Sequence, residues 1–62
     1  MSSYRIEKSK MNYAGESGYH VHLYEKQDNS FVHIFATFVA SKDSNDSYLI
    51  SKALEQLNNG EQ

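Results

Sequence analysis

The segment from Tyr19 to Phe38 constrains the fold of this chain more than any other. It reads YHVHLYEK, then QDNS, then FVHIFATF. Both halves are rich in β-branched and aromatic residues at alternating positions, which is typical of β-strands. Asp28 and Asn29 between them tolerate the left-handed conformations of a two-residue turn. We therefore expect a β-hairpin with strands at about 19–26 and 31–40.

The hydrophobic pattern of the hairpin also predicts how its strands pair. If Gln27 faces Ser30, most of the aliphatic side chains gather on one face, and a shift by one residue would mix the two faces. The predicted core face of the hairpin carries Val21, Leu23, Ile34, Ala36 and Phe38. The predicted outer face carries His20, His22, Tyr24, Phe31, His33 and Phe35.

A first strand is expected at about 4–13, but its apolar residues change parity along it. Tyr4 and Ile6 share one parity, whereas Met11 and Tyr13 share the other. A β-bulge between the two pairs would bring all four to one face, and without a bulge they point to opposite faces. We place Met11 and Tyr13 on the predicted core face.

The C-terminal part of the chain predicts one amphipathic helix at about 45–58, capped by Asp43 or Ser44. Its apolar stripe consists of Leu49, Ile50, Ala53, Leu54 and Leu57. Residues 14–18, with two glycines, are expected to form the loop between the first two strands. The predicted fold class is α+β, a three-stranded antiparallel β-meander with the helix packed on one face. We expect residues 1–62 to form a single small domain.

The size of the chain favours an oligomer. A 62-residue domain buries only about 60% of its unfolded surface and often needs a disulfide, a metal or a second subunit. The chain contains no cysteine, which excludes disulfides and thiolate zinc sites. One helix covers only one face of a sheet, and an uncovered aromatic face is unusual for a monomer. We therefore expect a homodimer.

The six residues of the predicted outer face form the candidate site, as a dimer interface or as a surface for another protein. Aromatic side chains are enriched at the centres of protein interfaces. Because histidine titrates near neutral pH, such an interface would also respond to pH.

The three histidines are candidate metal ligands. His20 and His22 lie about 7 Å apart on one side of a strand, and His33 is diagonal to His22. In the predicted register His33 is too far from His20, whereas zinc needs three or four converging ligands. Metal binding is therefore our third hypothesis, and we expect neither a metal nor another cofactor.

Nucleic-acid binding is our second hypothesis. The outer-face aromatics could stack on bases, flanked by a basic patch of Arg5, Lys8, Lys10 and Lys26. However, the net charge of the chain is −2, whereas nucleic-acid-binding domains usually carry a basic face.

Our first hypothesis is a small non-catalytic protein-binding module. We expect a homodimeric inhibitor or regulator of a larger protein complex, of the accessory type that phages and plasmids encode, such as an anti-defence protein. No catalytic motif and no phosphate-binding glycine loop is recognisable in the sequence. Residues Met1 to Arg5 do not begin an apolar leader, and no apolar run has transmembrane length. We expect a cytoplasmic location and no membrane partner.

Overall fold

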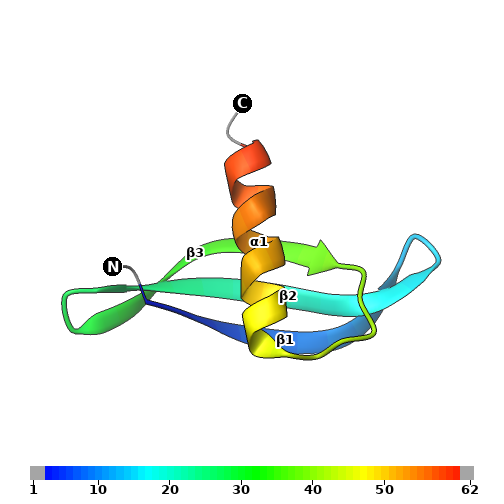
Figure 1. Ribbon diagram of the computed structural model, residues 1–62, viewed down its shortest axis with the longest axis horizontal. Helices are drawn as coiled ribbons and strands as arrows, with labels where there is room; N and C mark the ends of the chain where they lie inside the picture. Colours follow the sequence, from blue (N-terminus) through cyan, green and yellow to red (C-terminus); the bar gives the residue numbers. More distant parts are fainter. Residues whose placement is uncertain (1–2, 61–62) are drawn as a thin grey trace.

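The computed structural model describes residues 3–60 and shows one three-stranded antiparallel sheet with a C-terminal helix on one of its faces (Figure 1). The strand order is the chain order, β1-β2-β3. The elements are β1 (Tyr4–Tyr13), β2 (Glu16–Gln27), β3 (Ser30–Val39) and α1 (Asp46–Gly60). The predicted α+β meander is confirmed.

The two hairpin turns each contain two residues. Ala14 and Gly15 link β1 to β2 with φ angles of 53° and 82°, and Asp28, with a φ of 56°, begins the turn before β3. The loop predicted over residues 14–18 is therefore wrong. β2 begins three residues earlier than predicted, because only Ala14 and Gly15 are needed to reverse the chain.

The pairing of β1 with β2 is continuous and contains no bulge. It runs from Tyr4 opposite Glu25 to Tyr13 opposite Glu16. Ile6 lies opposite Leu23, so the side chains of Tyr4 and Ile6 share the face of Leu23. The placement of Met11 and Tyr13 on the core face is wrong, because the tight turn reverses the parity that a longer loop would have given.

A β-bulge is present in β3 instead. Tyr24 lies opposite His33 as predicted, but Leu23 lies opposite Phe35, which leaves Ile34 as the extra residue. One inserted residue reverses the parity of everything beyond it. The register predicted up to the bulge is therefore confirmed, and the register predicted after it is wrong.

Because of the bulge, three side chains of β3 lie on the opposite face of the sheet from the one predicted. Phe35 lies on the helix-covered side and packs against the core, although it was predicted on the outer face. Ala36 and Phe38 were predicted in the core, but they lie opposite His22 and His20 and so share their face.

Asn45 caps α1, rather than Asp43 or Ser44. Its Oδ1 accepts a hydrogen bond from the Tyr48 amide at 3.1 Å, and its carbonyl accepts one from the Leu49 amide at 3.1 Å. Asp43 instead accepts the Asn45 amide through Oδ1 at 2.9 Å, which stabilises the turn before the helix. The Asn45 side chain thus satisfies the orphan amide of Tyr48, and the Leu49 amide makes the first regular hydrogen bond of the helix.

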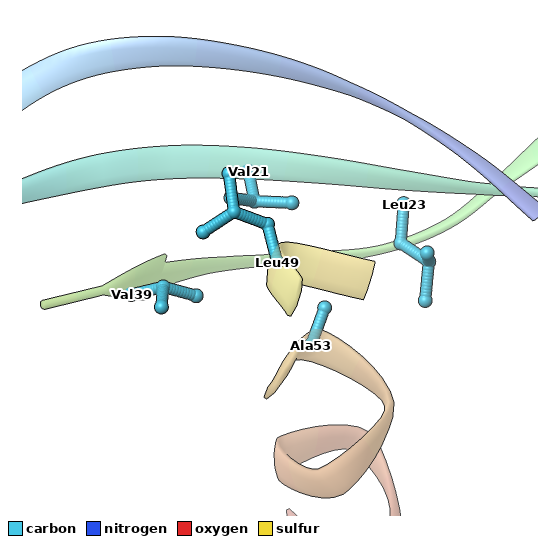
Figure 2. Packing of buried hydrophobic residues seen from close by; sticks show 5 residues of the cluster. All are labelled: Val21, Leu23, Val39, Leu49 and Ala53. Atoms are coloured by element: carbon cyan, nitrogen blue, oxygen red, sulfur yellow. The ribbon is translucent and has the colours of Figure 1, made fainter. Parts of the chain in front are cut away.

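The core is small and lies between α1 and the centre of the sheet. Among residues 3–60, five apolar side chains are buried: Val21, Leu23, Val39, Leu49 and Ala53. Figure 2 shows Leu49 and Ala53 of α1 directed toward the three strand residues. The half-buried residues around them are Tyr4, Ile6, Tyr19, Ile34, Phe35, Ile50 and Leu54. Four of the five residues of the predicted helical stripe, all but Leu57, therefore pack against the sheet.

The helix crosses the strands instead of running along them. Its first turn lies beside β1, where Lys8 Nζ donates to Asp46 Oδ1 at 2.6 Å, and its C-terminal turns project beyond β3 (Figure 1). The radius of gyration is 11.7 Å, against about 10.6 Å for a compact chain of this length. The protein is thus more open than a compact domain of the same length.

Within residues 3–60 the chain forms no helix with both the length and the hydrophobicity needed to cross a membrane.

Candidate protein-binding face

We call the side of the sheet away from α1 the open face. Its ring-bearing residues come from all three strands and share one side of the pleat. They are Tyr13 of β1, His20, His22 and Tyr24 of β2, and Phe31, His33 and Phe38 of β3. The open face exists because the only helix among residues 3–60 lies on the opposite side of the sheet.

The histidines form a contiguous chain of rings along the middle of the open face. His22 Nδ1 lies 3.0 Å from His33 Nε2, a hydrogen bond in which one ring nitrogen donates and the other accepts. The His20 ring meets the His22 ring edge-on at 4.7 Å, and the Tyr24 ring lies 5.3 Å from that of His33. These contacts orient the rings relative to one another.

The histidine chain does not provide a metal centre of the usual kind. Within the described part of the chain, no three His, Cys, Asp or Glu side chains converge on a point that could hold an ion. His22 and His33 direct one nitrogen of each ring at the other. This pair is short of the three or four ligands that a zinc site uses.

Tyr24 is held between opposite charges. Its hydroxyl donates to Glu7 Oε1 at 3.2 Å, and the Arg5 guanidinium lies 5.9 Å from the centre of its ring. Partial burial raises the pKa of Tyr24, and the neighbouring Glu7 carboxylate raises it further, while Arg5 lowers it. The same guanidinium lies 5.3 Å from the Phe31 ring. Arg5 therefore joins the rings of two strands through cation–π contacts.

Another aromatic contact lies at the end of the open face near the turn between β1 and β2. The Tyr13 and Phe38 rings lie 5.4 Å apart and bridge β1 and β3 across Gly18 of β2. An open hollow of about 460 Å³ adjoins this pair at the β3 edge. Its lining residues are Met11, Tyr13, His20, Thr37, Phe38 and Gln56.

The structure brings together five of the six residues that the sequence singled out. His20, His22, Tyr24, Phe31 and His33 all lie on the open face. Phe35 does not, because the bulge at Ile34 turns its side chain toward α1. Phe31 and His33 are exposed, whereas the three β2 side chains are half-buried by their neighbours.

The four basic residues of the predicted patch are not brought together. Arg5 and Lys26 lie on the open face, whereas Lys8 and Lys10 lie on the helix side of the sheet. Lys8 is occupied there by Asp46 and by the Ser44 carbonyl.

Four open-face residues were predicted on the core face instead: Met11, Tyr13, Ala36 and Phe38. The Ala14-Gly15 pair could have revealed the first two, because a two-residue turn fixes the parity of β1 against β2. Phe38 depends on the bulge, and the apolar run through Ile34 and Phe35 carries no sign of it.

Comparisons of this chain with protein-family models, with curated proteins and with solved structures found no match.

Proposed function

We propose that this chain is a small, non-catalytic protein-binding module that inhibits or regulates a larger protein by docking its open face on it. The observation that supports this proposal is that only one side of the sheet is covered by a helix within the described residues. α1 packs on one side, and the other side presents contiguous rings from β1, β2 and β3. Continuous apolar patches of this kind mark binding surfaces on soluble proteins.

The composition of the open face suits a protein partner. Aromatic residues and arginine are enriched at the centres of protein interfaces, and here Arg5 packs against Tyr24 and Phe31. The contacts of Tyr24 with Glu7 and of His22 with His33 hold side chains in place beforehand. Binding then loses less side-chain entropy than it would with free rotamers.

Inhibition by occupying a surface requires no catalytic group, and one small domain is enough for it. The specific form that we propose is an accessory inhibitor of the phage or plasmid type, such as an anti-defence protein. The homodimer that we also expect would use a different surface from the open face.

Nucleic acid remains the second candidate ligand, supported by the stacked Arg5, Tyr24 and Phe31. Two of the four basic residues lie on the helix side, and Glu7 stands beside Arg5 at 3.9 Å. Phosphate contacts dominate the affinity of such binders, so the open face is better suited to protein.

A comparative pull-down from lysate of the source cell tests the proposal. The bait is the tagged chain or its Tyr24→Ser/Phe31→Ser double variant, and Tyr48→Ser serves as the matched control. Tyr48 is an exposed aromatic on α1, with 39% of its surface accessible against 40% for Phe31. We expect a protein that the wild type and Tyr48→Ser recover equally and that the double variant loses, with nuclease treatment making no difference.

Equal recovery by all three baits would contradict the proposal. Recovery that nuclease abolishes would replace it with the nucleic-acid alternative. Circular dichroism of the double variant must match the wild type, so that a lost partner reports the surface and not the fold.

A further inference from the structure

The two edges of the sheet differ in charge. β3 is a terminal strand with the sequence SFVHIFATFV, which contains no formally charged residue. The opposite edge strand, β1, carries Arg5, Glu7, Lys8 and Lys10. Charged side chains on an edge discourage pairing with another strand, and an uncharged apolar edge permits it.

The helix is longer than the sheet is wide. α1 has 15 residues, which extend about 22 Å, whereas three strands span about 10 Å between their outer axes. The surplus lies on the β3 side, where the C-terminal turns project beyond the strand (Figure 1). This overhang is long enough to cover about two further strands.

Gln56 lies in the overhang, and its side chain reaches back to β3. Its side chain accepts a hydrogen bond from the Thr37 hydroxyl and donates to the Phe38 carbonyl at 3.4 Å. The carbonyl of Phe38 therefore points away from β2. In an antiparallel ladder the amide of Ala36, two residues earlier, points the same way.

The other half of β3 lacks this cover. Val32 lies opposite Glu25 and so belongs to the helix side of the sheet, yet 40% of its surface is exposed. α1 meets β3 near Thr37, five residues further along, and leaves the Val32 end bare. Each copy thus has one overhanging helix end and one bare strand end.

We propose that two copies pair along β3, antiparallel and about a two-fold axis near the middle of the strand, to form a six-stranded sheet. Antiparallel pairing sets the Thr37 end of one β3 beside the Val32 end of the other. The α1 overhang of each copy then covers the bare Val32 of its partner. A two-fold axis makes the same contact twice, as closed dimers require.

The buried area is large enough for a stable dimer only if the paired β3 strands and the two helix overhangs both contribute. Pairing the ten residues of β3 covers roughly 700 Å² over both copies, since the strand is about 33 Å long and the sheet about 10 Å thick. The two overhangs add roughly 500 Å² more. The total then reaches the about 1,200 Å² at which stable interfaces begin.

This pairing leaves the open face of each copy uncovered and joins the two faces into one. The edge dimer therefore concerns a different surface from the proposed partner site, and either can fail without the other. Packing of two open faces against each other is the competing dimer, and it would bury the ring residues instead.

Light scattering coupled to size exclusion tests the edge dimer at micromolar concentration. The wild type is expected at twice the 7.1 kDa mass of one chain. Ala36→Pro removes an outward amide, and Val32→Lys sets a charge beneath the partner helix, so each should raise the dissociation constant more than about tenfold. Lys10→Pro makes the same proline change on the β1 edge, and Tyr24→Ser alters the open face; both should remain dimeric.

Circular dichroism of each variant confirms that a lost dimer is not a lost fold. A wild type with the mass of one chain would overturn the proposal. A dimer that survives both Ala36→Pro and Val32→Lys would also overturn it, and loss with Tyr24→Ser alone would assign the contact to the open face.

Discussion

A Cβ placed on Gly18 would lie 2.8 Å from Cζ of Phe38, so the Phe38 ring occupies the space that any other residue at position 18 would need. The same Cβ would also collide with the Val39 carbonyl oxygen. Gly18 is buried within β2 and is not among the positive-φ glycines. Close approach of β3, and not a turn, is therefore the reason for a glycine here.

Replacing Gly18 with alanine should push β3 away from β2 and destabilise the fold. Overpacking of this kind costs about 1–3 kcal/mol, a large share of the stability that so small a core supplies. Chemical denaturation followed by circular dichroism measures the loss. Gly60→Ala is the matched control, because nothing lies within 4 Å of a Cβ there. Equal stability of the two variants would contradict the predicted clash.

The first hairpin turn contains a strain that one substitution should relieve. Ala14 has a φ of 53°, a region that is unfavourable for alanine but accepted by asparagine. Asn-Gly is the preferred sequence for a two-residue turn with two positive φ angles. Ala14→Asn should therefore stabilise the protein by about 0.5–1 kcal/mol and raise the melting temperature by a few degrees.

Gly15→Ala provides the opposite test in the same turn. The φ of Gly15 is 82° and its Cβ would meet nothing within 4 Å, so only the backbone conformation opposes alanine. We expect a loss of about 1 kcal/mol. A lower melting temperature for Ala14→Asn would show that the turn has another geometry.

Substitution of the helix cap Asn45 should destabilise the protein more than substitution of its neighbour Ser44. Asn45→Ala removes the acceptor of the Tyr48 amide and should cost about 1 kcal/mol in the free energy of unfolding. Ser44→Ala keeps the Ser44 carbonyl that Lys8 uses and should change stability little. Urea titration of both variants measures the difference, and a larger loss for Ser44→Ala would move the cap to that residue.

The titration of Tyr24 should depend on Glu7. Burial raises the pKa of Tyr24, and the Glu7 carboxylate raises it further, so its ¹³Cζ resonance should titrate above the ordinary value of about 10. Glu7→Gln should lower this midpoint, and Arg5→Ala should raise it. No change with Glu7→Gln would contradict the hydrogen bond.

The raised pKa of Tyr24 determines whether stability rises or falls with pH. A raised pKa in the folded state means that the neutral phenol stabilises the fold. This contribution is complete below about pH 10 and is lost as the pH rises through the folded-state pKa of Tyr24. Tyr24→Phe should lack that alkaline loss.

Regular patterns in the sequence predicted the regular parts of the structure. The strand alternation and the helical stripe at Leu49, Ile50, Ala53, Leu54 and Leu57 were enough for the meander, its order and the face of α1. Both signals are local, and each reports which side of an element is apolar.

The parts of the structure that were predicted wrongly depend on single residues in β3 and in the first turn. The bulge at Ile34 reverses the face of Phe35 and Phe38, and the short turn at Ala14 reverses the face of Tyr13. The bulge changes neither composition nor periodicity over a window long enough to detect, and the short turn is indicated only by the Ala14-Gly15 pair. Five site residues before or opposite the bulge kept their predicted face, and Phe35 beyond it did not.

Photo-crosslinking inside the source cell tests most directly whether the open face binds a protein. A benzophenone amino acid is placed at Phe31 on the open face or at Tyr48 on α1, two aromatic positions that are 40% and 39% exposed. We predict that the Phe31 probe forms a nuclease-resistant adduct with a protein larger than this chain and that the Tyr48 probe does not. Equal labelling from both positions, or no adduct from Phe31 beyond a second copy of the chain, would contradict it.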